Sequence, residues 1–208
     1  RQQGVGFGEA FQWDVPLCQG YASRVLGAAE GARGVPRVLS RLLAVIRDIR
    51  PDAVLITGWN EPGLAAAYPL MRVLGVPVIL RGDSNALRQR PAMARLRHRL
   101  LLSLVSAAVV VGRSNRQFYL NNGVPADRLI EGAHFVETER MAAMAQAHQG
   151  DRDDLRAELG FRPTDFVFTF SGKHVAFKRP LLLVEAAALA RRRGLPVKLL
   201  FAGSGELT

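Results

Sequence analysis

The stretch that decides the fold is residues 166–203, FVFTFSGKHVAFKRPLLLVEAAALARRRGLPVKLLFAG. It contains an apolar run rich in β-branched and aromatic residues, a short loop, an apolar-periodic segment that ends in arginines, and a second apolar run. A buried strand, a helix and another buried strand in this order are typical of a βαβ unit with parallel strands. The sequence therefore predicts an α/β protein.

The loop of this unit, residues 172–178, has the features of an anion-binding site. Such a loop lies beside a helix N-terminus, where unpaired amide groups and the helix dipole attract negative charge. Gly172 allows the backbone to approach a ligand, and Lys173 and Lys178 add positive charge. The chain has 28 lysines and arginines together, and its other lysine is Lys198. The lysines in this loop favour an oxyanion ligand, and two solvated loop lysines are the alternative interpretation.

The chain before this unit alternates between helices and strands in the same way. We expect helices at residues 35–50, 63–74 and 91–103, and one that opens at Ser114 as its N-cap. We expect strands at residues 53–57, 78–81, 107–111 and 128–130. These strands are apolar throughout, which favours a parallel sheet covered by helices on both faces.

The alternation breaks around residues 136–165 into polar, acidic and helical sequence. We place a domain boundary there, which gives a first domain of residues 1–145 and a second of residues 146–208. The chain has no initiator Met, and it stops after the second apolar run, where a helix would ordinarily follow. We therefore expect a fragment that is cut at both ends.

Composition and charge limit the classes of partner. With 49% hydrophobic and 22% charged residues, the chain is that of an ordinary globular protein. Its net charge of +10 implies an anionic partner, either a phosphorylated ligand, an acidic membrane surface or nucleic acid. Aromatic content of 7% and the lack of helix-turn-helix, RNA-recognition and zinc-finger patterns place nucleic acid last. We expect no nucleic-acid partner.

Cysteine and histidine usage bears on compartment and metal binding. Cys18 is the only cysteine, which excludes an intrachain disulfide and a zinc site built from cysteines. The cytosol is the natural compartment. His98, His134 and His148 show no metal-ligand spacing, and we infer no metal. The longest apolar stretch, residues 100–111, is too short to span a bilayer.

A basic amphipathic segment follows the second predicted strand. Its cations and apolar residues are Arg88, Arg90, Arg95, Arg97, His98 and Arg99, interleaved with Met93, Leu96, Leu100, Leu101 and Leu102. Such a segment can rest on anionic lipid, where each cation near the surface contributes roughly 1 kcal/mol. The alternative is a helix that covers the sheet and has a solvated outer face.

Together these residues resemble the family 4 glycosyltransferases, which are retaining nucleotide-sugar enzymes of the GT-B fold. Residues 172–178 fit the donor loop of that family, Gly-Arg/Lys-x4-Lys. Further similar stretches are residues 13–17, 20–21, 110–114 and 119–129, and residues 134–141 stand where the family usually has Pro-Asn-Gly-Val-Asp. The resemblance implies two Rossmann-like parallel-sheet domains, both incomplete in this chain.

The resemblance also implies roles for individual residues. The donor-binding residues would be Gly172, Lys173, Lys178, Gly203, Ser204 and Gly205. The lysines would hold the donor diphosphate, where they neutralise charge on the leaving nucleotide. Asp83 would be the catalytic residue that orients or deprotonates an acceptor hydroxyl, or else a helix N-cap or turn residue. Trp59 and Asn60 would line the acceptor side, or belong to a local turn. His174, inside the donor loop, is a ligand contact, a structural residue or merely exposed.

The implied function is transfer of a sugar, with retention, from a nucleotide diphosphate-sugar to a hydroxyl of a glycan or lipid-linked glycan, as in polysaccharide biosynthesis. The donor is a substrate, and no cofactor is implied. The enzyme would be cytoplasmic or peripheral at the inner face of the cell membrane. A non-catalytic GT-B-like binding module and a sugar-nucleotide epimerase are the alternatives.

The chain departs from the family pattern at several places. Lys173 stands where arginine is more common, and Arg179 replaces the usual glycine. The Glu-x7-Glu segment of the family, which contacts the donor, would lie beyond Thr208. The Gly-rich acceptor loop would precede Arg1, because no strand comes before the glycines of residues 4–8. The fragment by itself is therefore expected to be inactive.

Overall fold

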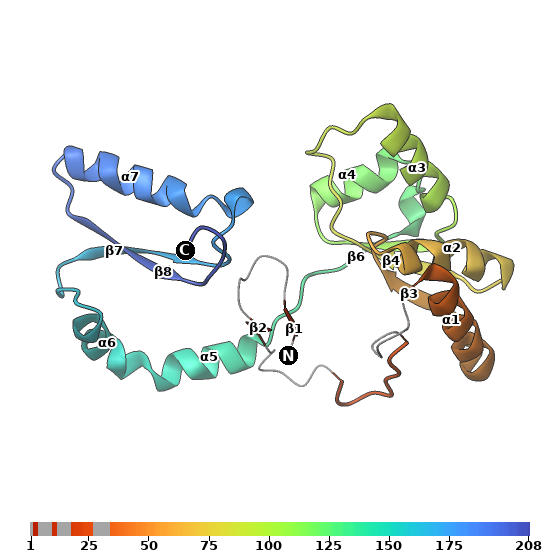
Figure 1. Cartoon of the computed structure of the whole chain (residues 1–208), viewed down its shortest axis with the longest axis horizontal. Coiled ribbons are helices and arrows are strands. Elements are labelled where there is room, and N and C mark those ends of the chain that lie inside the picture. Colours follow the sequence, from red (N-terminus) through yellow and green to blue (C-terminus); the bar gives the residue numbers. More distant parts are fainter. Residues whose placement is uncertain (1, 4–9, 12–17, 27–33) are drawn as a thin grey trace. The chain divides into compact units, whose positions relative to one another are not determined.

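The computed structural model describes residues 2–3, 10–11, 18–26 and 34–208 (Figure 1). The chain divides into two compact units, one of residues Ser23–Val136 and one that joins the described residues up to Ala22 with Glu137–Thr208. The boundary predicted at residues 145 and 146 falls inside helix α5 (Thr138–Ala147). The glycines of residues 4–8 and the similar stretch 13–17 lie outside the described residues.

The unit Ser23–Val136 is built on a parallel sheet of four strands. Its strands, in spatial order, are β3 (Val54–Thr57), β4 (Val78–Arg81), β5 (Ala107–Val110) and β6 (Leu129–Glu131). The helices that connect or precede them are α1 (Val35–Ile49), α2 (Pro62–Val73), α3 (Ala92–Leu102) and α4 (Arg113–Asn121), with a 3-10 turn at Ala126–Arg128. Because the strands are parallel and consecutive, their carboxyl ends meet at one edge of the sheet.

The core of this unit forms where α2 and α4 pack against the sheet. Its most buried side chains include Tyr68, Met71, Leu80, Val110 and Tyr119. The Tyr68 hydroxyl donates a hydrogen bond of 2.9 Å to the carbonyl of Gly58, and burial raises its pKa. A buried hydroxyl needs such a partner, and here the bond fixes the loop that follows β3.

The second unit contains the predicted βαβ arrangement. Strands β7 (Phe166–Ser171) and β8 (Val197–Ala202) pair in parallel, and α7 (Pro180–Arg192) crosses between them after the 3-10 turn Ala176–Lys178. The polar region before it forms α5, the 3-10 turn Gln149–Asp151 and α6 (Arg152–Glu158). Short strands β1 (Gln2–Gln3) and β2 (Ala10–Phe11) pair antiparallel.

The α/β class with parallel sheets is confirmed, and the predicted strands and helices agree with the structure within about two residues. The N-cap prediction for Ser114 is wrong. Helix α4 begins at Arg113 after Gly112, and Ser114 lies in its first turn. The Ser114 hydroxyl instead accepts a hydrogen bond of 3.3 Å from the amide of Ala86, so it holds the loop after β4. None of the helices in the described part of the chain combines the length and apolarity needed to cross a bilayer.

Candidate functional site

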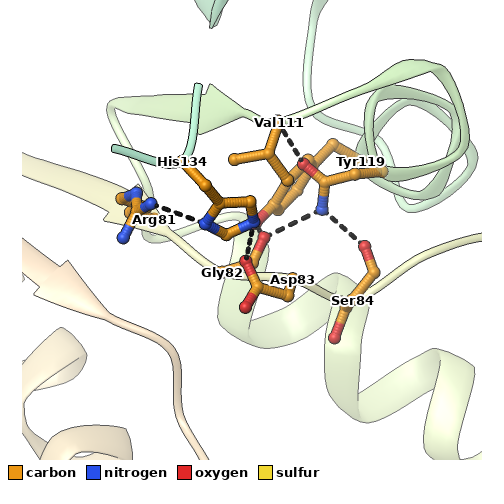
Figure 2. A network of polar contacts seen from close by, with 8 residues as sticks. Arg81, Gly82, Asp83, Ser84, Val111, Tyr119 and His134 are labelled. Carbon is orange, nitrogen blue, oxygen red and sulfur yellow. Dashed lines mark hydrogen bonds and ion pairs between the residues drawn. The ribbon is translucent and has the colours of Figure 1, made fainter. Parts of the chain in front are cut away.

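The sheet edge in the unit Ser23–Val136 brings Asp83 and His134 together (Figure 2). Asp83 follows β4 and His134 follows β6, and their Oδ1 and Nε2 atoms lie 3.6 Å apart. Arg81 donates a hydrogen bond of 3.0 Å to Nδ1 of His134. A guanidinium can only donate, so Nδ1 is the acceptor and the proton of the neutral imidazole lies on Nε2, facing the carboxylate. The ring thus links a cation to the predicted catalytic residue.

The backbone around Asp83 is held by helix α4. The buried Asn115 amide donates to the carbonyls of Gly82 (2.8 Å) and Ser84 (2.5 Å), and its oxygen accepts from the amide of Val111 at 3.1 Å. Tyr119 adds a hydrogen bond of 3.2 Å to the Gly82 carbonyl. These bonds, drawn in Figure 2, fix the loop. The Asp83 carboxylate remains exposed to solvent.

Tyr119 acts in this network as a donor. Burial raises its pKa to about 12, the hydrogen bond with Asn115 opposes this rise, and the charge of Asp83 adds to it. The hydroxyl therefore stays protonated at neutral pH. Its role is to position the Gly82 carbonyl.

A pocket of about 450 Å³ collects the predicted acceptor-side residues. Trp59 and Asn60, which follow β3, line it together with Asp83. Its cations are Arg81, Arg88 and Arg90. The structure thus brings Trp59 and Asn60 beside Asp83, which lies more than twenty positions further along the sequence. Their roles stay predictions.

In the second unit, the predicted donor loop is joined to the turn after β8. The amide of Gly172 donates to the carbonyl of Ala202 at 3.0 Å, and the amide of His174 donates to that of Ser204 at 2.9 Å. The amide of Leu207 in turn donates to the carbonyl of His174 at 3.0 Å. The two glycine-containing segments, residues 172–178 and 203–207, therefore form one double turn beyond the carboxyl ends of β7 and β8.

Glycine is required where these segments meet. Gly203 and Gly205 have φ values of 149° and 159°, which side chains rarely adopt. A Cβ at Gly203 would collide with the carbonyl of Gly172, and one at Gly205 would lie 2.5 Å from the carbonyl oxygen of His174. The backbones approach this closely only because neither position carries a side chain.

His174 is the structural centre of the double turn. Its ring is buried between Phe170 and Phe201, with centroid distances of 5.8 Å to both, and Nδ1 lies 3.1 Å from the Thr208 hydroxyl. Among the described residues, Nε2 has no hydrogen-bond partner. The burial of the ring excludes the exposed alternative and favours a structural role, while contact with a ligand stays a prediction.

The two donor-loop lysines differ in their surroundings. Lys173 is half-buried, whereas Lys178 is exposed with its Nζ atom 5.6 Å from the centroid of Phe177. Arg179 follows in a left-handed conformation (φ 54°) immediately before Pro180 and α7. This conformation explains why glycine is usual at that position in the family that the chain resembles, and arginine adopts it only at a cost of about 1 kcal/mol.

Sequence reasoning missed Arg81, Asn115 and His134. His134 carries a usable signal, because it follows a predicted strand at the same sheet edge as Asp83. Asn115 does not, because an asparagine in the first turn of a helix shows nothing of its distant partners. Among the described residues, no three His, Cys, Asp or Glu side chains cluster in a way that would hold a metal ion.

Comparison with known sequences shows that a short part of the chain is similar to a glycosyltransferase. No family model matches the chain. A segment of 64 residues is 41% identical to the D-inositol 3-phosphate glycosyltransferase of Rhodococcus erythropolis, and it covers 30% of this chain and 14% of that protein.

Comparison with solved structures covers most of the chain. Anabaena Alr3699/HepE in complex with UDP matches with a TM-score of 0.57 and 13% identity, over 81% of this chain and 52% of that one. The UDP-GlcNAc 2-epimerase of Neisseria meningitidis, bound to UDP-GlcNAc, matches with a TM-score of 0.50 and 15% identity, over 84% and 49%. The chain thus spans about half the length of these structures. Its α/β fold with parallel sheets is that of GT-B-type UDP-sugar enzymes.

Proposed function

We propose that the protein is a retaining glycosyltransferase that takes its sugar from a nucleotide diphosphate donor. The observation that carries the proposal is the double turn of residues 172–178 and 203–207, in which close-packed glycine backbone and two lysines lie at the carboxyl ends of parallel strands. This is the place where α/β folds bind the phosphates of nucleotides. The 41% identical segment of a known glycosyltransferase supports the choice of reaction.

In this proposal, Lys173 and Lys178 hold the diphosphate and the turn at Gly203–Gly205 lies against the nucleotide. The bond between the anomeric carbon and the phosphate oxygen breaks, and a new bond forms to the acceptor oxygen on the same face. The acceptor proton leaves with the nucleoside diphosphate. The lysines stabilise the negative charge that develops on the departing phosphate.

On the acceptor side, Asp83 orients the attacking hydroxyl. Its carboxylate accepts a hydrogen bond from the hydroxyl, and the proton itself passes to the departing phosphate. The His134 ring lies beside the carboxylate, and the hydrogen bond from Arg81 sets its tautomer. Trp59 and Asn60 contribute the adjoining wall of the pocket. The acceptor is a glycan or a lipid-linked glycan.

A sugar-nucleotide epimerase is the second candidate, favoured by the likeness to the N. meningitidis epimerase. It would use the same diphosphate site but change the configuration of the sugar without an acceptor. The two reactions therefore differ in product and not in donor recognition.

We place the protein in the cytoplasm, at the inner face of the cell membrane. The single cysteine, Cys18, is exposed and suits a reducing compartment. Helix α3 supports membrane contact, because Met93, Leu96 and Leu100 are exposed on it among arginines.

Product analysis tests the proposal. The full-length gene product that contains this chain is incubated with isotope-labelled UDP-sugars, with and without extracted glycans and glycolipids. Transfer of label to an acceptor, with the anomeric configuration of the donor, is the expected result. Accumulation of an epimeric sugar without acceptor favours the second candidate, and intact donor in every reaction contradicts both.

A further inference from the structure

A pocket of about 780 Å³ in the unit Ser23–Val136 lies between α3, α4 and the loop that precedes α3. Its cations are Arg88, Arg90, Arg95 and Arg99, and we call it the arginine pocket. Leu96 and Phe118 are among its apolar residues. We propose that the arginine pocket binds a phosphate ester, with the phosphate on the guanidinium groups and the esterified part against Leu96 and Phe118.

Among the described residues, the charges of the arginine pocket have no acidic partner that lines it. Between Asp83 and Asp127 the sequence contains no acidic residue. Within the described parts of the chain, no acidic side chain lines the pocket or pairs with Arg88, Arg95 or Arg99. Arg95 and Arg99 are four residues apart on α3, where like charges repel each other. A bound dianion would remove this repulsion.

Arg90 is held in place before any ligand arrives. Its Nη1 atom donates to the carbonyls of Asn85 (2.8 Å) and Arg88 (3.1 Å), and its guanidinium lies 4.7 Å from the centroid of Phe118. A fixed guanidinium loses little side-chain entropy on binding, and its planar fork matches the oxygens of a phosphate.

The pKa of the neighbouring His98 reflects the positive potential of this region. Its ring packs against Phe118 at 5.5 Å, and its pKa is lowered by burial and then by the charges of Arg90 and Arg97. The region behind the pocket thus disfavours a further cation, and an anion in the pocket would be attracted by the same field.

The position of the arginine pocket suggests which substrate carries the phosphate. Arg88 and Arg90 also line the pocket of Asp83, so the two pockets share a wall. An acceptor that presents its hydroxyl to Asp83 would place a phosphate in the arginine pocket. This last step rests on the proposed function and identifies the acceptor as a phosphorylated molecule, either free or a lipid.

Matched variants on one helix test the site. Glycerol 3-phosphate is titrated onto the chain by calorimetry, and vesicles of phosphatidylglycerol or phosphatidylcholine are tested by sedimentation. Arg95→Gln and Arg99→Gln should each weaken binding about tenfold, since hydrogen bonds to charged groups contribute more than 1 kcal/mol. Arg97→Gln is the control, because it removes the same charge from α3 at a position that does not line the pocket.

The probe that shows this pattern identifies the source of the phosphate. Binding of glycerol 3-phosphate supports a free phosphate ester, and binding of phosphatidylglycerol vesicles alone supports a lipid. Equal weakening by all three variants, or no binding to either probe, overturns the proposal. UDP titrated onto the same samples separates the two hypotheses: intact UDP binding with no phosphate-ester binding refutes the arginine pocket and leaves the glycosyltransferase proposal standing.

Discussion

At the scale of single residues, Gly205 makes the close approach between the donor loop and the turn after β8 possible. We predict that Gly205→Ala lowers the free energy of unfolding of its unit by about 3 kcal/mol, because strain at positive φ adds to a collision with the His174 backbone. The measurement is urea unfolding followed by circular dichroism. UDP binding should be lost in the same variant.

Gly112 is the matched control for this prediction. It has the same φ of 159°, but a Cβ built on it meets no atom within 4 Å. Gly112→Ala should therefore cost only the conformational strain, about 1 kcal/mol. If the two variants lose equal stability, the collision with His174 is not what requires glycine at residue 205.

A second residue-scale prediction concerns His98 and pH. Its pKa is lowered in the folded protein, chiefly by burial, from the ordinary value of 6.5 that applies to the unfolded chain. Its contribution to stability is present above pH 6.5 and is lost as the pH falls, because the unfolded state then binds the proton more readily. Between about pH 7.5 and pH 5.5, the unfolding temperature of the wild type should fall more than that of His98→Gln. Parallel pH profiles of the two proteins would refute this assignment.

At the scale of elements, Asn115 ties helix α4 to the loop after β4. Asn115→Ala should lower the free energy of unfolding by about 3 kcal/mol, since three part-buried backbone groups each lose a hydrogen bond, although the Gly82 carbonyl keeps the one from Tyr119. Chemical denaturation measures the change. Gln117→Ala on the same helix removes only an exposed bond to Asn121 and should cost less than about 0.5 kcal/mol. A comparable loss in both variants would mean that the loop is held by other contacts.

The elements themselves could largely be predicted from the sequence. Strand β4 has the predicted bounds, and the βαβ unit of β7, α7 and β8 follows the predicted order. Local periodicity and turn residues determine such elements, and both are visible in a single sequence. Ser114 was misassigned because the residue type suits an N-cap, whereas its actual partner, Ala86, belongs to another loop.

At the scale of the whole molecule, the candidate sites were predictable only in part. The sequence could predict that Asp83, Trp59 and Asn60 lie close together, because the loops that follow parallel strands meet at one edge of the sheet. The contact between Arg81 and His134 joins residues 53 positions apart, and no local pattern encodes it. The arginine pocket depends likewise on how α3 packs beside α4.

The proposed function depends most on binding of a nucleotide diphosphate by the double turn of the second unit. Calorimetric titration of UDP onto the wild type, Lys178→Ala and Lys198→Ala tests this claim directly. Lys198 is the matched control, an exposed lysine on strand β8, outside the double turn. We predict that Lys178→Ala weakens UDP binding about tenfold and that Lys198→Ala leaves it within about twofold of the wild type. Equal effects of the two substitutions, or no binding of UDP to the wild type, would contradict the claim.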